Sequence, residues 1–226
     1  MKRTVLLTGC SKGIGKAIAK KLVEQGEYTI YAITQNPQDV PPDLAGSLNL
    51  YSCDLTDIPR SIETILCVLL DSGGIDILIN NAGIGKFALA ESLELDHWNR
   101  VLTLNLTIPF LLTKYVLPHM KRKNFGRLIH ITSDADHIGF AEGSLYCASK
   151  FGLRGFADSV RQELKGTPIT VTTIGPGRVD TFFNGKKPGD RPISLYAEDV
   201  ANQVIHVLTQ SERCEIERIY LKSTFE

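Results

Sequence analysis

Short apolar runs rich in β-branched residues alternate along this chain with longer stretches of helical periodicity. The short runs lie at 3–8, 28–34, 48–53, 75–79, 126–132, 169–174 and 215–221. The helical stretches lie at 13–25, 58–71, 97–123, 144–165 and 197–209. Strands that alternate with helices predict a parallel sheet with helices on both faces. We therefore expect an α/β fold of the doubly wound Rossmann type, with a mostly parallel sheet of seven strands.

The length of the chain suits one such domain. Its 226 residues allow a single α/β domain with a substantial core and are few for two. No repeat, low-complexity tract or linker divides the sequence, although Pro41-Pro42 and Asn184–Pro192 have the composition of loops. We therefore expect one domain over residues 1–226.

Charge and cysteine content narrow the classes of function. The 25 basic and 25 acidic residues cancel, and nothing resembles the basic surface of a nucleic-acid-binding protein or a polybasic membrane segment. No stretch approaches the roughly 18 uninterrupted apolar residues of a membrane span. The five cysteines are scattered without a C-x-x-C pair, which is typical of reduced thiols in a cytoplasm. We expect a cytoplasmic enzyme that binds no nucleic acid, membrane or metal.

A glycine-rich turn follows the first predicted strand directly. The segment Thr8–Gly15 reads TGCSKGIG and leads into the first helical stretch. Its three glycines allow a tight turn, a close approach of the backbone to a diphosphate, and close packing of helix on strand. The amides at the start of the helix then face the negative charge. A plain strand-to-helix turn is the alternative, but the position between a first strand and an amphipathic helix favours a bound nucleotide.

The end of the second predicted strand indicates which nucleotide is bound. NAD-specific domains of this kind place an acid there to bind the ribose 2′-hydroxyl. This strand has no acid, and Ile33 is assigned to the equivalent position. Lys12 lies in the glycine turn, where its ammonium would reach a 2′-phosphate, and Thr34, Gln35 and Asn36 would add hydrogen bonds. Although Lys12 as a solvated loop residue is the alternative, the sequence favours NADP(H) over NAD(H).

A tyrosine and a lysine one helical turn apart form a second candidate site. Tyr146 and Lys150 lie on one face of a predicted helix. There an ammonium favours the phenolate and brings a tyrosine pKa, ordinarily about 10, toward the working range. Ser133 and Asn81 each follow an apolar strand, at the carboxyl edge where ligands bind in such sheets. Asn105 is a polar residue in an otherwise apolar helical stretch.

Together these motifs closely resemble the short-chain dehydrogenase/reductase superfamily. Thr8–Gly15 resembles its TGxxxGIG turn, Asn81-Ala82-Gly83 its NNAG strand end, and Tyr146 with Lys150 its YxxxK pair. The resemblance runs from Thr4 to about Leu221, in order and with the expected spacings. It implies that the cofactor is held by Gly9, Ser11, Lys12, Gly13, Ile14, Gly15, Thr34, Asp54, Leu55, Asn81, Ala82, Gly83, Tyr146, Lys150, Pro176, Gly177, Val179 and Thr181.

The resemblance also implies a role for each of the four catalytic residues. Tyr146 would donate a proton to the carbonyl oxygen in reduction, or remove it in oxidation, and Ser133 would hydrogen-bond that oxygen. Lys150 would tune Tyr146 and hold the ribose hydroxyls, and Asn105 would fix a water that connects Lys150 to solvent. Asp54 would contact the adenine. The activity so implied is NADP(H)-dependent hydride transfer between the nicotinamide and a small ketone, aldehyde or hydroxy compound.

The segment after Ser133 departs from the family pattern. Asp134, Asp136 and His137 stand where relatives often have a small residue and a glycine. Acids so close to the substrate would select a basic or hydroxyl-rich compound. The alternative, which we favour slightly, is a solvated loop with a local side-chain-to-backbone turn.

The segment between Thr181 and the last helical stretch is short, which predicts a small lid over the substrate. It contains Lys186, Lys187 and Arg191. These residues either attract a carboxylate or phosphate on the substrate or form a solvated basic loop, and we favour the solvated loop.

Two other functions stay open on the sequence alone. One is an NAD-dependent hydroxy-acid or alcohol dehydrogenase that runs in the oxidative direction. The other is a nucleotide-sensing protein that kept the fold and lost turnover, but such a protein is expected to lose the tyrosine or the lysine, and both are present. By analogy with the family we expect a homodimer or homotetramer that pairs through helices 97–123 and 144–165.

Overall fold

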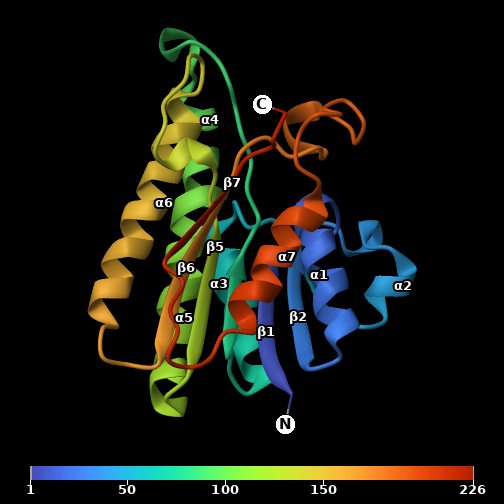
Figure 1. The fold of residues 1–226 in the computed structure, drawn as a ribbon, viewed down its shortest axis with the longest axis vertical. Helices are drawn as coiled ribbons and strands as arrows, with labels where there is room; N and C mark the ends of the chain where they lie inside the picture. Colours follow the sequence, from blue (N-terminus) through green and yellow to red (C-terminus); the bar gives the residue numbers. More distant parts are fainter. Residues whose placement is uncertain (1, 226) are drawn as a thin grey trace.

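A twisted parallel sheet forms the centre of the molecule (Figure 1). The structure is a computed structural model, and it describes residues 2–225. The strands are β1 (Arg3–Thr8), β2 (Tyr28–Thr34), β3 (Asn49–Ser52), β4 (Ile77–Asn80), β5 (Gly126–Ile131), β6 (Ile169–Pro176) and β7 (Arg218–Leu221). They form a seven-stranded sheet in the order β3-β2-β1-β4-β5-β6-β7, and every neighbouring pair is parallel. The predicted fold class is therefore confirmed.

Helices cover both faces of this sheet (Figure 1). One face carries α1 (Gly13–Gln25), the short α2 (Pro42–Ala45) and α7 (Ala197–Leu208). The other carries α3 (Ile58–Ser72), α5 (Ile108–Lys123) and α6 (Ser144–Glu163), with α4 (Leu95–Leu102) leading into α5. Short 3₁₀ turns lie in the connections, at Pro37–Asp39, Ala90–Ser92, Asp134–Asp136 and Phe183–Gly185.

Alternation along the central strands explains why both faces are covered. In β1, Val5 and Leu7 pack on the side of α1 and α7, whereas Leu6 between them packs on the side of α3, α5 and α6. All three side chains are fully buried. Burial of an aliphatic side chain of this size stabilises the fold by about 1.5–3 kcal/mol, so each strand anchors helices on both faces.

Strands β4 and β7 are shorter than their apolar runs predict, because side-chain carboxylates replace part of the backbone hydrogen bonding between strands. At the start of β4, the Asp76 carboxylate accepts the amide hydrogen of Thr4 at 3.0 Å, and the strand begins at Ile77 rather than at 75. Before β7, Glu215 accepts the amide hydrogen of Val171 at 3.0 Å, and the strand begins at Arg218 rather than at 215.

The predicted helix at 97–123 contains an irregularity that the sequence does not reveal. It begins at Leu95 and passes through a turn of π-helix at Thr103–Thr107 before it continues as α5. The whole stretch Leu95–Lys123 has the length and hydropathy to cross a membrane, yet much of it is buried against the sheet and neighbouring helices. It is the core helix of one layer, and its π turn carries Asn105 into the candidate site.

The strand order reverses between β1 and β4, since the chain runs outward from β1 to β3 and then returns to the other side of β1. In doubly wound sheets ligands bind at such a switch point, outside the carboxyl ends of the strands. The glycine turn after β1 and the NNAG segment after β4 meet at this point.

Candidate active site

The glycine turn after β1 has the geometry of an anion-binding loop. Gly9 and Gly13 adopt left-handed φ values of 75° and 56°, which disfavour any residue with a Cβ. A Cβ on Gly15 would lie 1.9 Å from the Gly9 carbonyl oxygen, so α1 packs directly on the turn. The helix has no side-chain cap and no acid in its first turn. Its first amides and its dipole are therefore free for an anion, and the residues present fit a dinucleotide diphosphate.

The NNAG segment holds this turn in place. The Asn81 side-chain amide donates to the carbonyl oxygens of Thr8 and Gly9 at 2.9 and 3.0 Å. The Thr8 hydroxyl accepts the amide hydrogens of Asn81 and Ala82, each at 3.0 Å. The structure thus joins two sequence motifs 72 residues apart, and it gives Thr8, the first residue of the glycine motif, a connecting role that the sequence did not predict.

The end of β2 differs from the expected alignment. Ile33 is fully buried in the cluster beneath α3 and α5, so its side chain lies on the wrong face to meet a nucleotide at the glycine turn. Thr34 lies two residues after Ala32 in the strand, so its side chain is on the same face as that of Ala32, which packs with α1. The strand therefore presents a neutral threonine on the cofactor side. Gln35 donates to Asp54 Oδ2 at 3.1 Å.

Other residues expected at the cofactor lie in the glycine turn itself or follow β3 and β6. Asp54 accepts from the amide and the hydroxyl of Thr56 at 2.9 and 2.7 Å, and these hydrogen bonds lower the pKa of its carboxyl. Thr181, from the segment after β6, lies against Gly13, since a Cβ there would be 3.4 Å from the Thr181 methyl carbon. Lys12 is exposed, with its ammonium 5.9 Å from the centre of the Phe182 ring. The thiol of Cys10 is buried, which raises its pKa to about 11.

Tyr146 lies in the first turns of α6, with Ser133 at the end of β5 beside it. Burial raises the pKa of the Tyr146 phenol above its ordinary value, whereas a hydrogen bond with the Ser133 side chain acts in the opposite direction. The Ser133 hydroxyl donates to Asp134 Oδ1 at 2.9 Å and accepts the Ala135 amide hydrogen at 3.2 Å. The sequence predicted a pKa lowered toward the working range by Lys150, but in the structure burial acts in the other direction and the phenol is protonated at neutral pH.

Lys150 is almost fully buried one turn further along α6. Its ammonium donates to the carbonyl oxygen of Ile131 at 3.0 Å and lies 5.7 Å from the centre of the Tyr146 ring. Burial lowers the pKa of Lys150 to about 8, and the negative charge of Asp136 opposes that effect. Lys150 is thus close to its own titration at physiological pH.

Asn105 connects the π turn to the strand end after β4. Its Oδ1 accepts the Ile84 amide hydrogen at 3.0 Å, and its side-chain amide donates to the Ile84 carbonyl oxygen at 2.9 Å and to Ser149 Oγ at 3.0 Å. Both Asn105 N–H groups are engaged, so a water bound to this side chain would have to donate to Oδ1. Ser149, which in turn donates to the Tyr146 carbonyl oxygen at 2.7 Å, was not singled out from the sequence.

The acids after Ser133 do not form the solvated loop that we favoured. Asp136 is completely buried and accepts from the Tyr220 hydroxyl at 3.0 Å, with His137 Nδ1 at 2.9 Å from the same oxygen. Asp134 is half-buried and holds the Ser133 hydroxyl. The local turn does exist, since Ser133 caps it, but the acids face inward because Ser133 binds Asp134 and Tyr220 of β7 binds Asp136.

The segment before α7 that contains Lys186, Lys187 and Arg191 is the solvated basic loop that we favoured from the sequence. Lys186 and Lys187 are exposed, whereas Arg191 donates to the Val179 carbonyl oxygen at 3.2 Å and supports the segment itself. Asp180 accepts the amide hydrogens of Gly189 and Arg191 at 2.6 and 3.3 Å.

Comparison with known proteins decides the family. The profile described as "short chain dehydrogenase" matches residues 3–192. The chain belongs to this family. As a member it is an oxidoreductase that acts on a carbonyl or hydroxyl group with a nicotinamide cofactor.

Relatives of this family member differ in the reactions for which they are named. The 3-oxoacyl-[acyl-carrier-protein] reductase FabG of Vibrio cholerae is 37% identical over 181 residues, which cover 79% of this chain and 74% of the relative. The sepiapterin reductase of Chlorobaculum tepidum is 29% identical, over 99% of this chain and 97% of the relative. The structure of an alcohol dehydrogenase from the archaeon Thermococcus sibiricus, complexed with 5-hydroxy-NADP, has a TM-score of 0.91 and 25% identity over 100% of this chain and 98% of that one.

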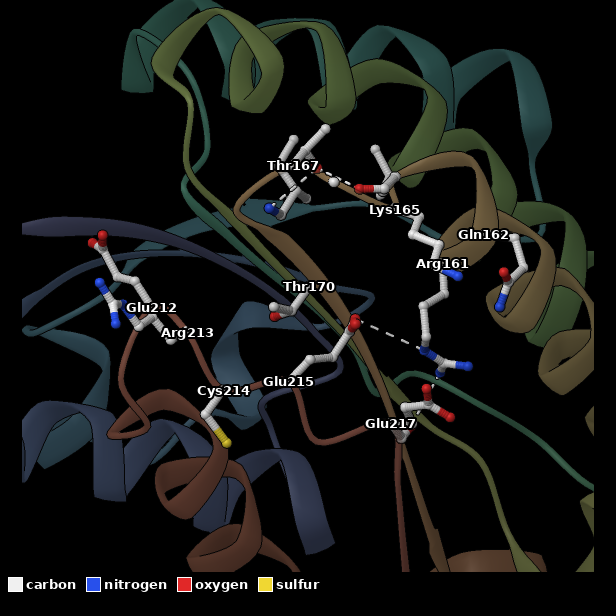
Figure 2. Close-up of a pocket in the computed structure, with 13 residues that line it drawn as sticks. Arg161, Gln162, Lys165, Thr167, Thr170, Glu212, Arg213, Cys214, Glu215 and Glu217 are labelled. Atoms are coloured by element: carbon white, nitrogen blue, oxygen red, sulfur yellow. Dashed lines mark hydrogen bonds and ion pairs between the residues drawn. The ribbon is translucent and has the colours of Figure 1, made fainter.

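A cavity elsewhere in this family member is separate from the candidate site. Figure 2 shows a pocket of about 270 Å³ between the end of α6 and the segment before β7. The segments that line it lead into β6 and β7 and therefore lie at the amino edge of the sheet, opposite Ser133 and Tyr146. Its most buried charge, Arg161, donates to the carbonyl oxygens of Val171 and Glu217 at 2.9 and 3.1 Å and pairs with Asp158 and Glu215. Arg161 thus joins α6 to β6 and to the segment before β7, which is a structural role.

Proposed function

We propose that this chain is an NADP(H)-dependent carbonyl reductase or alcohol dehydrogenase, with Tyr146 as the acid–base residue. The observation that carries the proposal is the buried arrangement of Tyr146, Lys150, Ser133 and Asn105 at the carboxyl edge of the sheet, next to a glycine turn suited to a diphosphate. A bound nicotinamide cofactor supplies or accepts the hydride.

In the direction of reduction, Tyr146 gives its proton to the oxygen of the carbonyl group. The phenol is protonated at neutral pH and gives up its proton as that oxygen gains negative charge, which the positive charge of Lys150 favours by stabilising the phenolate. Ser133 orients the same oxygen by a hydrogen bond, for which its hydroxyl turns away from Asp134. Preorganised donors of this kind in a buried site contribute a few kcal/mol each, about 2.7–4 kcal/mol in measured cases.

Lys150 and Asn105 return the proton and keep the tyrosine in place. The positive charge of Lys150 stabilises the phenolate left after transfer. With a pKa of about 8, Lys150 also exchanges protons readily near neutral pH. Asn105 Oδ1 and the Lys150 ammonium both face Gly83, where a Cβ would lie 3.3 and 3.7 Å from them. We propose that a water between these two groups carries the proton toward solvent.

NADP(H) is favoured as the cofactor for three reasons. Thr34 stands on the cofactor side of β2, where an acid would repel a 2′-phosphate. Lys12 is exposed beside the turn and forms no ion pair with a carboxylate of the described residues, so its charge is available to that phosphate. A similar alcohol dehydrogenase structure holds 5-hydroxy-NADP. We further propose a cytoplasmic enzyme that forms a homodimer or homotetramer through α5 and α6.

The test is the loss of NADPH absorbance with a panel of small ketones, aldehydes and 3-oxo acids, run in parallel with NADH. Turnover with NADPH and little with NADH is the expected result. Equal or faster turnover with NADH would replace the proposal by the NAD-dependent dehydrogenase. Tight NADPH binding without turnover of any compound would support a nucleotide-sensing protein instead.

A further inference from the structure

Two phenylalanines, Phe87 and Phe183, pack on the ring of Tyr146, and a third, Phe140, packs on Phe87. Phe87 follows the strand end after β4, Phe140 lies in the connection before α6, and Phe183 lies in the segment between β6 and α7. The centre of the Tyr146 ring is 5.5 Å from that of Phe87 and 5.6 Å from that of Phe183. Phe87 in turn lies 5.8 Å from Phe140 and 6.4 Å from Phe183. We call Phe87, Phe140 and Phe183 the phenyl cluster.

Two glycines provide the space in which these rings lie. A Cβ on Gly85 would be 2.8 Å from the Phe183 ring and 3.1 Å from the Phe87 ring. A Cβ on Gly143 would be 2.4 Å from the Phe140 ring. The rings therefore lie directly against the backbone of these two glycines, where a larger residue would displace them.

The phenyl cluster covers the proton donor only partly. Tyr146 retains 9% of its surface, Phe87 and Phe183 are half-buried, and Phe140 is 48% exposed. Phe183 is followed by Asn184 and Gly185, both with left-handed φ values of 58° and 73°. Phenyl rings that serve only to stabilise a fold are normally buried. Partly exposed phenyl rings beside a reacting hydroxyl therefore indicate an apolar surface that a bound ligand covers.

We propose that the substrate is a neutral ketone or aldehyde bearing an aromatic ring, which packs among Phe87, Phe140 and Phe183 while its carbonyl oxygen meets Tyr146. This inference rests on the proposed function and names its substrate class. Aromatic rings attract one another in tilted and edge-on arrangements at centre separations of about 4.5–7 Å, the range already found within the cluster. A carboxylate or phosphate gains no attraction from the negative face of an aromatic ring, so these rings favour a neutral compound.

The test compares phenylacetone with cyclohexylacetone, and both with 3-oxobutanoate, in the NADPH-absorbance assay. The ring of the first two ketones is one carbon from the carbonyl group, so the carbonyl reactivity is similar and the ring type is what differs. The variant Phe87→Leu keeps an apolar side chain and removes the aromatic ring. The control variant Leu70→Ala deletes a side chain that is 83% exposed near the C-terminal end of α3, at the opposite edge of the sheet.

For the parent chain we expect kcat/KM for phenylacetone to exceed that for cyclohexylacetone by about tenfold, with 3-oxobutanoate lowest. Phe87→Leu reduces the ratio of the two ketones toward one, and Leu70→Ala leaves it unchanged. Equal use of the two ketones by the parent, or preference for 3-oxobutanoate, would overturn the inference and leave the reductase proposal intact. No NADPH loss with any compound, from protein that binds NADPH, would overturn the proposed function and this inference with it.

Discussion

The Tyr220 hydroxyl of β7 donates a hydrogen bond of 3.0 Å to Oδ1 of Asp136, a carboxylate with no exposed surface. The His137 ring covers the same pair, with its centre 4.4 Å from that of Tyr220 and its Nδ1 2.9 Å from the carboxylate. Asp136 also acts on Lys150, whose pKa it raises against the effect of burial. The last strand of the sheet is thereby linked to the lysine of the active site.

Replacement of Asp136 by Asn should change the pH dependence of turnover. Lys150 is charged below its pKa of about 8 and loses its proton above it. Because Asp136 favours the charged form, its neutralisation lowers that pKa further, and the alkaline limb of the kcat profile moves to lower pH by about 0.5–1 unit. The measurement is the rate of NADPH oxidation between pH 6 and 10. Tyr220→Phe, which keeps the carboxylate, is the control and should leave the limb near that of the parent. If the alkaline limb of Asp136→Asn stays at the pH of the parent, Asp136 does not affect the protonation of Lys150.

Lys150→Met should abolish turnover and stabilise the fold at neutral pH. The folded-state pKa of about 8 lies below the ordinary value of 10.5, so the charged lysine opposes folding at every pH below about 8, and this cost fades as pH rises toward the ordinary value. Removing it gains about 1–3 kcal/mol of unfolding free energy at pH 7. Loss of the hydrogen bond to Ile131 offsets part of that gain. Urea unfolding at pH 7 and pH 10 measures both values, and the gain should shrink at pH 10. A variant less stable than the parent at pH 7 would contradict this prediction and show that Lys150 stabilises the fold.

Lys12→Ala should weaken binding of NADPH selectively. We expect its Kd for NADPH to rise about tenfold, as for loss of a charge-assisted contact at a partly exposed site, with no change for NADH. Fluorescence titration of both nucleotides measures this difference. Lys16→Ala removes an exposed lysine in the first turn of α1 and is the matched control. An equal effect of Lys12→Ala on both nucleotides would place the ammonium away from the 2′-phosphate.

The sequence predicted the arrangement of strands and helices because the central strands are continuous apolar runs, whose successive side chains point to opposite faces and require cover on both. It did not predict where side-chain carboxylates replace backbone hydrogen bonds between strands, as Asp76 does at Thr4 and Glu215 does at Val171. The π turn at Thr103–Thr107 was also missed. The residues of this turn are of the same types as those of the regular helix around it, so no sequence pattern marks it. It is defined by a distant contact, in which Asn105 accepts the amide hydrogen of Ile84.

At the candidate site, sequence reasoning identified the residues that carry local motifs and missed those that depend on distant contacts. Thr8, Gly13 and Asn81 stand in short patterns with a direct physical meaning. The burial of Asp136 depends on Tyr220, which lies 84 residues away. The phenyl cluster likewise depends on three connections that converge only in the folded chain. Side chains whose surroundings come from remote segments leave no local pattern.

The most direct test of the account is Tyr146→Phe, followed as the stopped-flow absorbance of NADPH with a ketone that the parent reduces, together with the Kd for NADPH. Loss of the hydroxyl removes the proton donor and little else from a ring packed between Phe87 and Phe183. The account predicts a decrease in kcat of about 10²–10⁴-fold with NADPH affinity essentially unchanged. A rate close to that of the parent would remove Tyr146 from the chemistry and contradict the proposed mechanism.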